Sequence, residues 1–479
     1  MWLAGAQILT MPISVALNAL LGRYLGPSEF GDLYLAQTLC SFAFLALEWG
    51  QAGTLPALVA ADRARAPKLL GSALAFRCGG MVFVTAFLFL ICRVLGYTPG
   101  FRVSLGLVAL GSFAGSVLGA YLAVVRGFER SDITAFAQVV QQILTALLVV
   151  PVLLFGGRLH SVLLTQALVA ACVLVVIVRA ARTLGVHGLS FDTLTIKSLF
   201  KEGTSFLFLG IVLALQPNID AVFLSKLAPA EVVGWHAATR KLVGLLIFPA
   251  SALVQALYPT LSRLNTENPD EFVRVASRTL TTAMLLVVPV VACCALYPEV
   301  GVRIYSEKAF GPVADNLRLM AIFLGLLYLS MVLGCAIAAT GKRQPWVIAQ
   351  SLCLVVSMAL DPLLIPWFQE HHGNGGLGLC ISTIVSEALM FAAGIYLSRR
   401  GIFNRRVLIK GFWILLSAGA MLAVALLLKK VPALPALVAA PIAVATYAGA
   451  LVLSGALEQS EIVALRGFVA TRLPRWLKR

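Results

Sequence analysis

The sequence predicts an all-α, polytopic membrane protein, because its apolar residues form many helix-length runs and its charges gather between them. Of its 479 residues, 60% are hydrophobic and only 12% are charged, and the mean hydropathy is +0.94. About 20 apolar residues in a helix cross the hydrocarbon core of a bilayer. We identify fourteen such runs, at 2–22, 33–55, 69–92, 104–125, 134–155, 161–180, 203–224, 233–257, 277–297, 314–337, 344–366, 377–397, 408–428 and 436–456.

The basic residues predict how these helices are oriented. The even-numbered connections and the C-terminal tail hold 24 Lys and Arg residues, whereas the odd-numbered connections hold 10. Cytoplasmic loops carry the excess of such residues, so both termini are expected in the cytoplasm. Most of the net charge of +16 then reflects this bias. A nucleic-acid partner is not expected, because it would require a basic face on a folded soluble surface.

Two short motifs indicate an internal repeat. LGPSEFG at 25–31 and LAPAEVVG at 227–234 lie 202 residues apart, and each opens a new apolar run. The ends of the fourth and tenth runs, LGA at 118–120 and LGC at 333–335, are similarly related. A unit of six helices repeated in the same orientation is an architecture typical of transporters. We therefore predict six-helix bundles at 1–184 and 198–398, two additional helices at 407–457 and a tail at 458–479.

The tail alternates basic and apolar residues. Such a segment is typical of an amphipathic helix that lies on a membrane surface. We expect it to rest on anionic lipids at the cytoplasmic face, where basic residues are attracted to the leaflet.

Charged residues inside the apolar runs are candidates for functional groups, since they are costly in a bilayer. Glu48 in the second run and Arg77 in the third both lie roughly 11 Å from the cytoplasmic end, at 1.5 Å per residue. They are expected to form an ion pair. The pair either serves substrate or ion coupling, or only locks two helices together.

The seventh and eighth runs contain the strongest candidate cluster. Asp220 follows Pro217, which removes a backbone hydrogen bond, and Arg240 and Lys241 enter from the same outer side. Neighbouring side chains on a helix point about 100° apart. We therefore expect only one of the two cations to face a cavity, while the other pairs with an acid or extends toward the interface.

Three glutamines form a polar stripe on the fifth run. Gln138, Gln141 and Gln142 are spaced to lie on one helix face. They are expected to face a wet cavity, the alternative being hydrogen bonds between helices.

The remaining candidates are isolated charges. Asp361 in the eleventh run and Glu387 in the twelfth have no partner visible in the sequence, and either could carry a coupling proton because burial favours the neutral carboxyl. Arg23 lies near the outer interface, where extension of the side chain toward water is its usual explanation.

No sequence feature favours a soluble enzyme or an ATP-driven pump. A phosphate-binding loop and a nucleophilic triad are both missing. The nine cysteines form no Cys-x-x-Cys pair and are expected to be small packing residues. Neither a metal nor a bound cofactor is expected.

Several segments together resemble bacterial polysaccharide flippases, the oligosaccharide and O-antigen exporters of the multidrug/oligosaccharidyl-lipid/polysaccharide (MOP) superfamily. They are GRYLGPSEFG at 22–31, NID at 218–220, VGWHAATRKL at 233–242, ATGK at 339–342 and GGLG at 375–378. The resemblance extends over nearly the whole chain, including the arrangement of six, six and two helices.

This resemblance implies a V-shaped pair of bundles around a central cavity. It implies that a polyprenyl-pyrophosphate-linked oligosaccharide is flipped across the bacterial cytoplasmic membrane by alternating access, for surface polysaccharide biosynthesis, with polymerase or assembly proteins as partners. A cationic cavity would hold the pyrophosphate, the candidates being Arg240, Lys241, Arg77 and the weaker Arg23. A proton or sodium gradient would supply energy through buried acids, Asp220 and Glu48 first and then Glu387 and Asp361.

Two other functions compete with this interpretation. The first is a cation-coupled multidrug exporter of the same superfamily, which would favour an acidic cavity. The second is a membrane-embedded glycan ligase or glycosyltransferase, which would need a larger outer loop than any present here. Flipping of a peptidoglycan precursor is disfavoured, because residues 1–22 lack the arginines that mark the first helix of lipid II flippases.

Overall fold

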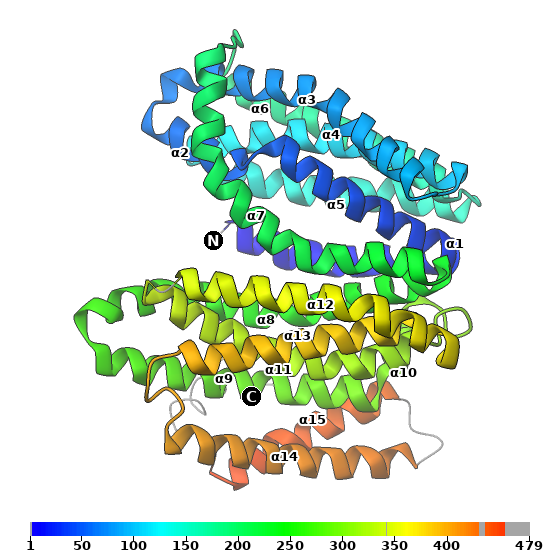
Figure 1. The fold of residues 1–479 in the computed structure, drawn as a ribbon, viewed down its shortest axis with the longest axis vertical. Coiled ribbons are helices and arrows are strands. Elements are labelled where there is room, and N and C mark those ends of the chain that lie inside the picture. Colours follow the sequence, from blue (N-terminus) through cyan, green and yellow to red (C-terminus); the bar gives the residue numbers. More distant parts are fainter. Residues whose placement is uncertain (1, 342, 431–435, 456–479) are drawn as a thin grey trace, which may run out of the picture. The chain divides into compact units, whose positions relative to one another are not determined.

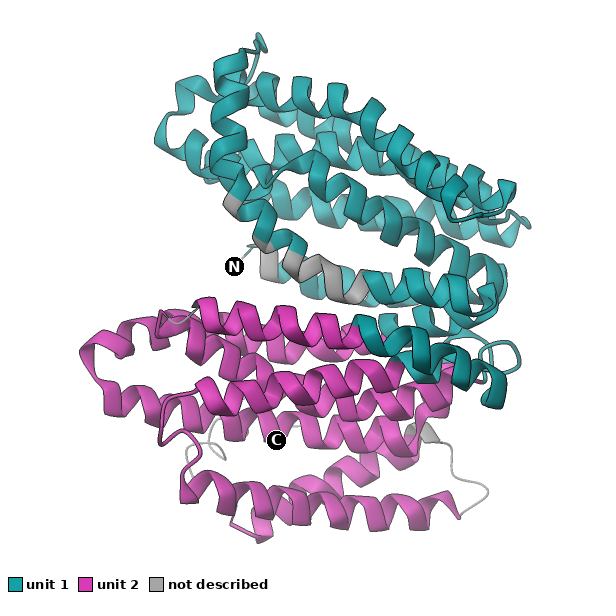
Figure 2. Cartoon of the chain, viewed as in Figure 1, with its two compact units in different colours: residues 1–241, 304–311, 358–379 teal, residues 242–303, 312–357, 380–479 magenta. Residues whose placement is uncertain are grey.

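The computed structural model describes residues 2–341, 343–430 and 436–455, which are helical with no strand among them. They divide into two compact units (Figure 2). Unit 1 comprises residues 1–241, 304–311 and 358–379, and unit 2 comprises residues 242–303, 312–357 and 380–479. The all-helical fold class is confirmed.

The helices follow one another along the chain as labelled in Figure 1. Those that begin in unit 1 are α1 (Trp2–Glu48), α2 (Gln51–Ala61), α3 (Ala66–Val94), α4 (Pro99–Gly127), α5 (Ser131–Leu154), α6 (Leu159–Thr183), α7 (Thr193–Leu227) and α8 (Ala230–Glu267). A short 3-10 turn, Arg63–Arg65, precedes α3. Helix α13 (Gly375–Leu397) also begins in unit 1, in its 358–379 segment. Those that begin in unit 2 are α9 (Pro269–Leu296), α10 (Pro298–Tyr305), α11 (Val313–Ala339), α12 (Arg343–His372), α14 (Arg405–Lys429) and α15 (Ala436–Leu453).

The described residues of every predicted apolar run are mainly helical, although the runs and the helices do not correspond one to one. Eleven of the described helical segments are long and apolar enough to cross a bilayer, and Val438–Leu453 is a shorter apolar helix. The chain is therefore a multi-pass membrane protein, while the count of fourteen spans stays a prediction. The second predicted run is interrupted, because Trp49 and Gly50 adopt positive φ angles of 45° and 69° and separate α1 from α2.

Helix α1 contains the first predicted run and most of the second, joined at Gly26. This residue has φ 74° and ψ 172°, a region of backbone space that essentially only glycine occupies. Pro27 follows, at a position where its fixed φ suits the first turn of a helix. The chain therefore bends within the first repeat motif, between the part of α1 that precedes Gly26 and the part that follows it (Figure 1).

The main apolar core of unit 1 joins α2, α3, α4 and α6. Leu55, Leu70, Leu118 and Ile177 are members of one buried cluster there. Aliphatic side chains on four helices interdigitate in this cluster, and the resulting dense packing gives rigid support to the neighbouring polar groups.

Unit 2 has two apolar clusters. One joins α8, α9 and α11, and the other joins α9 to the predicted additional helices α14 and α15. Two tyrosines fasten the second cluster: the Tyr297 hydroxyl donates to the Ala425 carbonyl at 3.0 Å, and the Tyr447 hydroxyl donates to the Leu285 carbonyl at 3.3 Å. The additional helices are thus an integral part of unit 2.

The predicted tail at 458–479 lies outside the described residues. The four predicted domain ranges stay predictions, since the compact units are defined by contacts and take segments from several parts of the chain.

Candidate functional site

The two repeated motifs pack against each other in unit 1. A methyl group added to Gly234 would lie 1.9 Å from the Pro27 carbonyl oxygen, and one added to Gly31 would lie 2.5 Å from the Ala230 carbonyl oxygen. Both distances are far below van der Waals contact, so only glycine permits this approach of α1 to α8. The contact determines where the polar side chains of both helices lie.

A polar cavity of 190 Å³ lies beside this contact, entirely within unit 1. Helices α1, α5, α6 and α8 contribute its polar lining, namely Ser14, Asn18, Tyr34, Gln37, Gln142, Thr145, Gln166 and Lys241. Lys241 supplies the only cation among the residues that line it. The cavity therefore combines one positive charge with several amide and hydroxyl groups.

Arg240 has different surroundings from its neighbour Lys241. The charge of Arg240 acts on both the Tyr34 hydroxyl and Asp220. Asp361 on α12 is the second charge that acts on Asp220. Two carboxylates and one guanidinium thus form a cluster in unit 1, as expected for Asp220 and Arg240 and with Asp361 added.

The cluster is buried, and some of its polar atoms have no hydrogen-bond partner among the described residues. Asp220 is 2% exposed, Asp361 is fully buried, and His236 is 1% exposed. Within the described chain, Asp220 Oδ1 and both ring nitrogens of His236 have no hydrogen-bond partner. Because buried polar atoms are nearly always paired, these atoms mark a place where a proton, cation or water can bind.

Tyr34 connects the cluster to the cavity. It lines the polar cavity, lies close enough to Arg240 for that charge to act on its hydroxyl, and lies edge-on to the His236 ring at 6.4 Å between centroids. A change of charge in the cluster can therefore reach the cavity through one side chain.

Arg77 and Glu48 form the expected ion pair, with 3.9 Å between Nη1 and Oε1. The guanidinium also donates from Nε to Gln51 Oε1 at 3.0 Å, and from Nη1 to the Ser116 hydroxyl at 3.1 Å and the Ser116 carbonyl. The Arg77 side chain is only 1% exposed, whereas that of Glu48 is 33% exposed. This geometry favours the helix-locking alternative for Arg77.

Arg23 is not among the residues that line the polar cavity. Its Nε donates to the carbonyls of Ile304 and Tyr305 at 2.9 and 2.7 Å. The side chain therefore holds the end of α10 against α1.

The predicted glutamine stripe is divided. Gln142 lines the polar cavity, whereas Gln138 is exposed and Gln141 is half-buried, and neither lines it.

Glu387 lies in unit 2, buried near Ser330 and Cys353. It belongs to a different compact unit from Asp220.

Sequence reasoning missed most of the cavity lining. Asn18, Tyr34, Gln37, Thr145 and Gln166 are all polar residues inside apolar runs. A polar residue inside an apolar run is a sign of a functional position, but a single sequence does not show that these residues line the same cavity.

Comparisons with known proteins agree with this architecture. Residues 1–265 match the family described as polysaccharide biosynthesis protein, and residues 206–363 match the MatE family. No curated protein matches in sequence. The structure titled "Lipid II flippase MurJ, inward closed conformation" has a TM-score of 0.75 at 11% identity and covers 94% of this chain and 97% of that chain.

Two further similar structures are MATE transporters. An inward-facing multidrug resistance MATE family transporter of the MOP superfamily has a TM-score of 0.61 at 16% identity, covering 81% of this chain and 94% of that one. A Vibrio cholerae MATE transporter, VcmN, has a TM-score of 0.57 at 16% identity, covering 83% and 96%. The fold is therefore that of the MOP superfamily of transporters and flippases.

The family match is more specific than the fold. It spans more than half of the 479 residues. The chain belongs to the polysaccharide biosynthesis protein family of this superfamily.

Proposed function

We propose that the protein flips a polyprenyl-pyrophosphate-linked oligosaccharide from the cytoplasmic to the outer leaflet of the bacterial cytoplasmic membrane. The observation that carries this proposal is the polar cavity of unit 1, with Lys241 among amide and hydroxyl groups, in a chain of the polysaccharide biosynthesis protein family.

The chemistry of the cavity suits such a substrate. An ammonium is a compact charge that pairs well with phosphate oxygens. The side-chain amides of Asn18, Gln37, Gln142 and Gln166 each offer both donors and acceptors, which matches the hydroxyl groups of sugars. The polyprenyl chain is apolar and stays in the bilayer while the polar head crosses.

The cluster of Asp220, Asp361 and Arg240 is the proposed coupling site. When Asp220 and Asp361 are both ionised, their like charges repel each other, and a buried negative charge of this kind is costly. Uptake of a proton or a sodium ion neutralises that charge, and Tyr34 transmits the change to the cavity. A transmembrane ion gradient then supplies the energy, and no resident cofactor takes part.

The protein is also proposed to have a defined orientation in the membrane and specific binding partners. The distribution of basic residues supports an orientation with both termini in the cytoplasm, and the tail is proposed to rest on anionic lipids. Polymerase and assembly proteins for a surface polysaccharide are the expected protein partners, and nucleic acid is not a partner.

Mass spectrometry of polyprenyl-linked lipids tests the proposal. The host is compared with and without the gene, and with the gene restored as wild type or as the control Lys430→Gln, which removes an exposed lysine. We expect one lipid-pyrophosphate oligosaccharide to accumulate without the gene and to disappear on restoration. An unchanged lipid profile together with new drug sensitivity would instead identify a multidrug exporter, the function suggested by the MatE match.

A further inference from the structure

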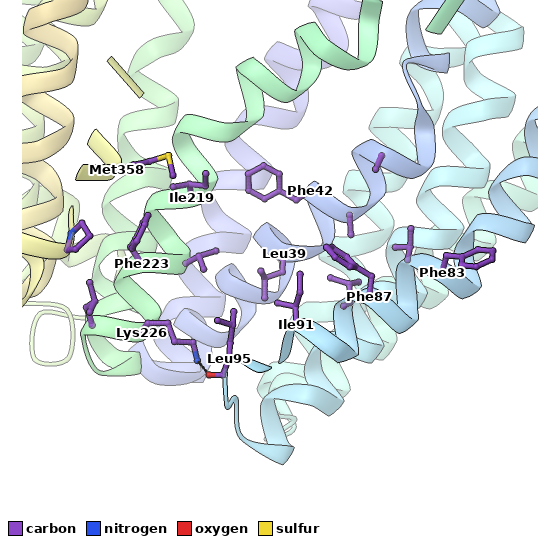
Figure 3. A pocket seen from close by; sticks show the side chains of 17 residues that line it. Leu39, Phe42, Phe83, Phe87, Ile91, Leu95, Ile219, Phe223, Lys226 and Met358 are labelled. Carbon is purple, nitrogen blue, oxygen red and sulfur yellow. Dashed lines mark hydrogen bonds between the residues drawn. The ribbon is translucent and has the colours of Figure 1, made fainter. Parts of the chain in front are cut away.

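Two adjoining cavities of unit 1, separate from the polar cavity above, share the side chain of Lys226. The larger has a volume of 1030 Å³ and lies between α1, α3, α7 and α12; apart from Lys226 its lining residues are apolar (Figure 3). The smaller has a volume of 230 Å³ and includes Asp32, Tyr97, Thr98 and Ser225 in its lining. An apolar groove therefore ends at a small polar chamber.

The groove has the length of one membrane leaflet. Helix α3 lines it with Phe83, Phe87 and Ile91, and Leu95, directly after the helix, continues the row. Figure 3 shows Lys226 beside Leu95 at one end of this row. Twelve residues of helix extend about 18 Å, close to half of a hydrocarbon core of about 30 Å. Phe83 and Phe87 are 78% and 55% exposed. This length suits a single acyl chain of a phospholipid better than a long polyprenyl chain.

The end beside Lys226 lies where helices finish and a lipid head group would sit. Lys226 is in the last turn of α7, and its Nζ donates to the Leu95 carbonyl at 2.5 Å and lies 3.3 Å from the centre of the Tyr97 ring. The Tyr97 hydroxyl and Ser225 Oγ are hydrogen-bonded at 2.7 Å. Lys226 is exposed, and no acid of the described residues lies within 4.0 Å of its ammonium.

The polar chamber also has an acid. Asp32 on α1 lines it together with Lys226, yet among the described residues the two form no ion pair, and the nearby Glu29 adds its negative charge at Asp32. One cation and one anion thus border a chamber large enough to hold a group between them. A ligand with both a negative and a positive charge complements this arrangement.

We infer that the groove and the chamber bind a phospholipid with a phosphate–primary ammonium head group, of the phosphatidylethanolamine type. Lys226 pairs with the phosphate, Asp32 accepts hydrogen bonds from the ammonium, and one acyl chain lies along Phe83, Phe87 and Ile91. Charge-assisted hydrogen bonds of this kind are the strong ones.

Other lipids fit less well. A purely anionic lipid leaves Asp32 facing negative charge. A choline head group has no N–H to donate to the carboxylate. The pyrophosphate of a polyprenyl carrier carries more negative charge still and no ammonium. The chemistry of the chamber therefore selects for a primary ammonium.

Native mass spectrometry of the full-length protein, delipidated and then supplied with dioleoyl lipids or with a polyprenyl phosphate, tests this inference. We expect phosphatidylethanolamine to bind about tenfold more tightly than phosphatidylcholine or phosphatidylglycerol, a difference of about 1.4 kcal/mol. Lys226→Gln is expected to weaken its binding about tenfold. Asp32→Asn is expected to abolish the preference for phosphatidylethanolamine over phosphatidylglycerol. Ala46→Phe, which fills the groove, is expected to weaken all three lipids, and Lys430→Gln none.

Two results with the wild type and one with a variant would each overturn part of the inference. Equal binding of the three lipids by wild type would remove the head-group assignment, as would an unchanged preference in Asp32→Asn. Tighter binding of a polyprenyl phosphate than of phosphatidylethanolamine would make the groove a carrier-tail site. If Lys226→Gln does not elute as a folded monodisperse protein, Asp32→Asn decides alone, because no described hydrogen bond or ion pair of Asp32 is lost in it.

Discussion

Lys241 and Arg240 are neighbours in the chain, but one side chain borders a polar cavity and the other a buried carboxylate. Lys241 lines the polar cavity, whereas Arg240 offsets the charge of buried Asp220 and acts on the Tyr34 hydroxyl. Adjacent positions on a helix diverge by about 100°, which accounts for the division. The two residues should therefore fail in different ways when substituted.

The first prediction concerns Lys241→Gln. Loss of one charge-assisted hydrogen bond, about 1.5–3 kcal/mol, should weaken substrate binding by roughly ten- to hundredfold, with an unchanged melting temperature because the side chain is exposed to the cavity. The measurements are lipid accumulation in the complemented host and thermal melting of the purified protein. Full export by this variant would remove Lys241 from the site.

Arg240→Ala should lose both export and stability. Its removal leaves buried Asp220 without the cation that acts on it, and breaking a buried charge pair in this way costs about 3–5 kcal/mol. Asp220→Asn in the same chain should recover part of the melting temperature but not export. A stable Arg240→Ala protein would show that the guanidinium does not compensate the acids.

Arg77 and Glu48 provide a test of the locking role. Arg77→Met should lower the melting temperature strongly, since Gln51 and Ser116 lose their buried partner, with a cost of about 3–5 kcal/mol. Glu48→Gln should have a much smaller effect, because Glu48 is one-third exposed. Comparable melting of Arg77→Met and wild type, with export lost, would favour a direct role in binding.

At the scale of helices, the repeated motifs are the main determinant of how α1 meets α8. Gly31 and Gly234 allow two backbones to approach within a distance that any side chain would prevent. When two repeats are related by an axis, equivalent motifs can meet close to that axis. The sequence similarity of the motifs and their contact are therefore consistent with one another.

Gly234→Ala is the corresponding prediction. The added methyl would overlap the Pro27 carbonyl, and overpacking of this kind costs about 1–3 kcal/mol. Gly244→Ala on the same helix is the matched control: a methyl there meets nothing within 4 Å, and the higher helix propensity of alanine should raise stability slightly. Equal melting temperatures for the two variants would contradict this account of the contact.

At the scale of the whole molecule, the distribution of basic residues predicts the orientation in the membrane. Arg400→Cys, in the connection before α14, should react with a membrane-impermeant thiol reagent only after cells are opened. Arg158→Cys, in the connection before α6, should react in intact cells. The native exposed cysteines Cys78 and Cys172 are replaced by alanine in both variants and in the background control. The reverse pattern would invert the predicted topology.

Much of the architecture could be predicted because it depends on local sequence. Helix positions follow from the length of apolar runs relative to bilayer thickness, and this held for most described residues of every run, although the break at Trp49 and Gly50 was not foreseen. The pairing of Arg77 with Glu48 could be anticipated because few charges lie at that depth. The convergence of Asp361 with Asp220 could not, since α12 and α7 are distant in sequence.

The sequence by itself determined the membrane class, the helices and the family, because hydrophobic length, charge distribution and short motifs are properties of contiguous residues. Only the tertiary structure decided which polar groups share a cavity. It separated Lys241 from Arg240, joined Asp361 to Asp220, and placed Asp32 and Lys226 in one chamber. Such neighbourhoods arise from the packing of helices far apart in the chain, where close-packed apolar surfaces leave each polar side chain few positions to occupy.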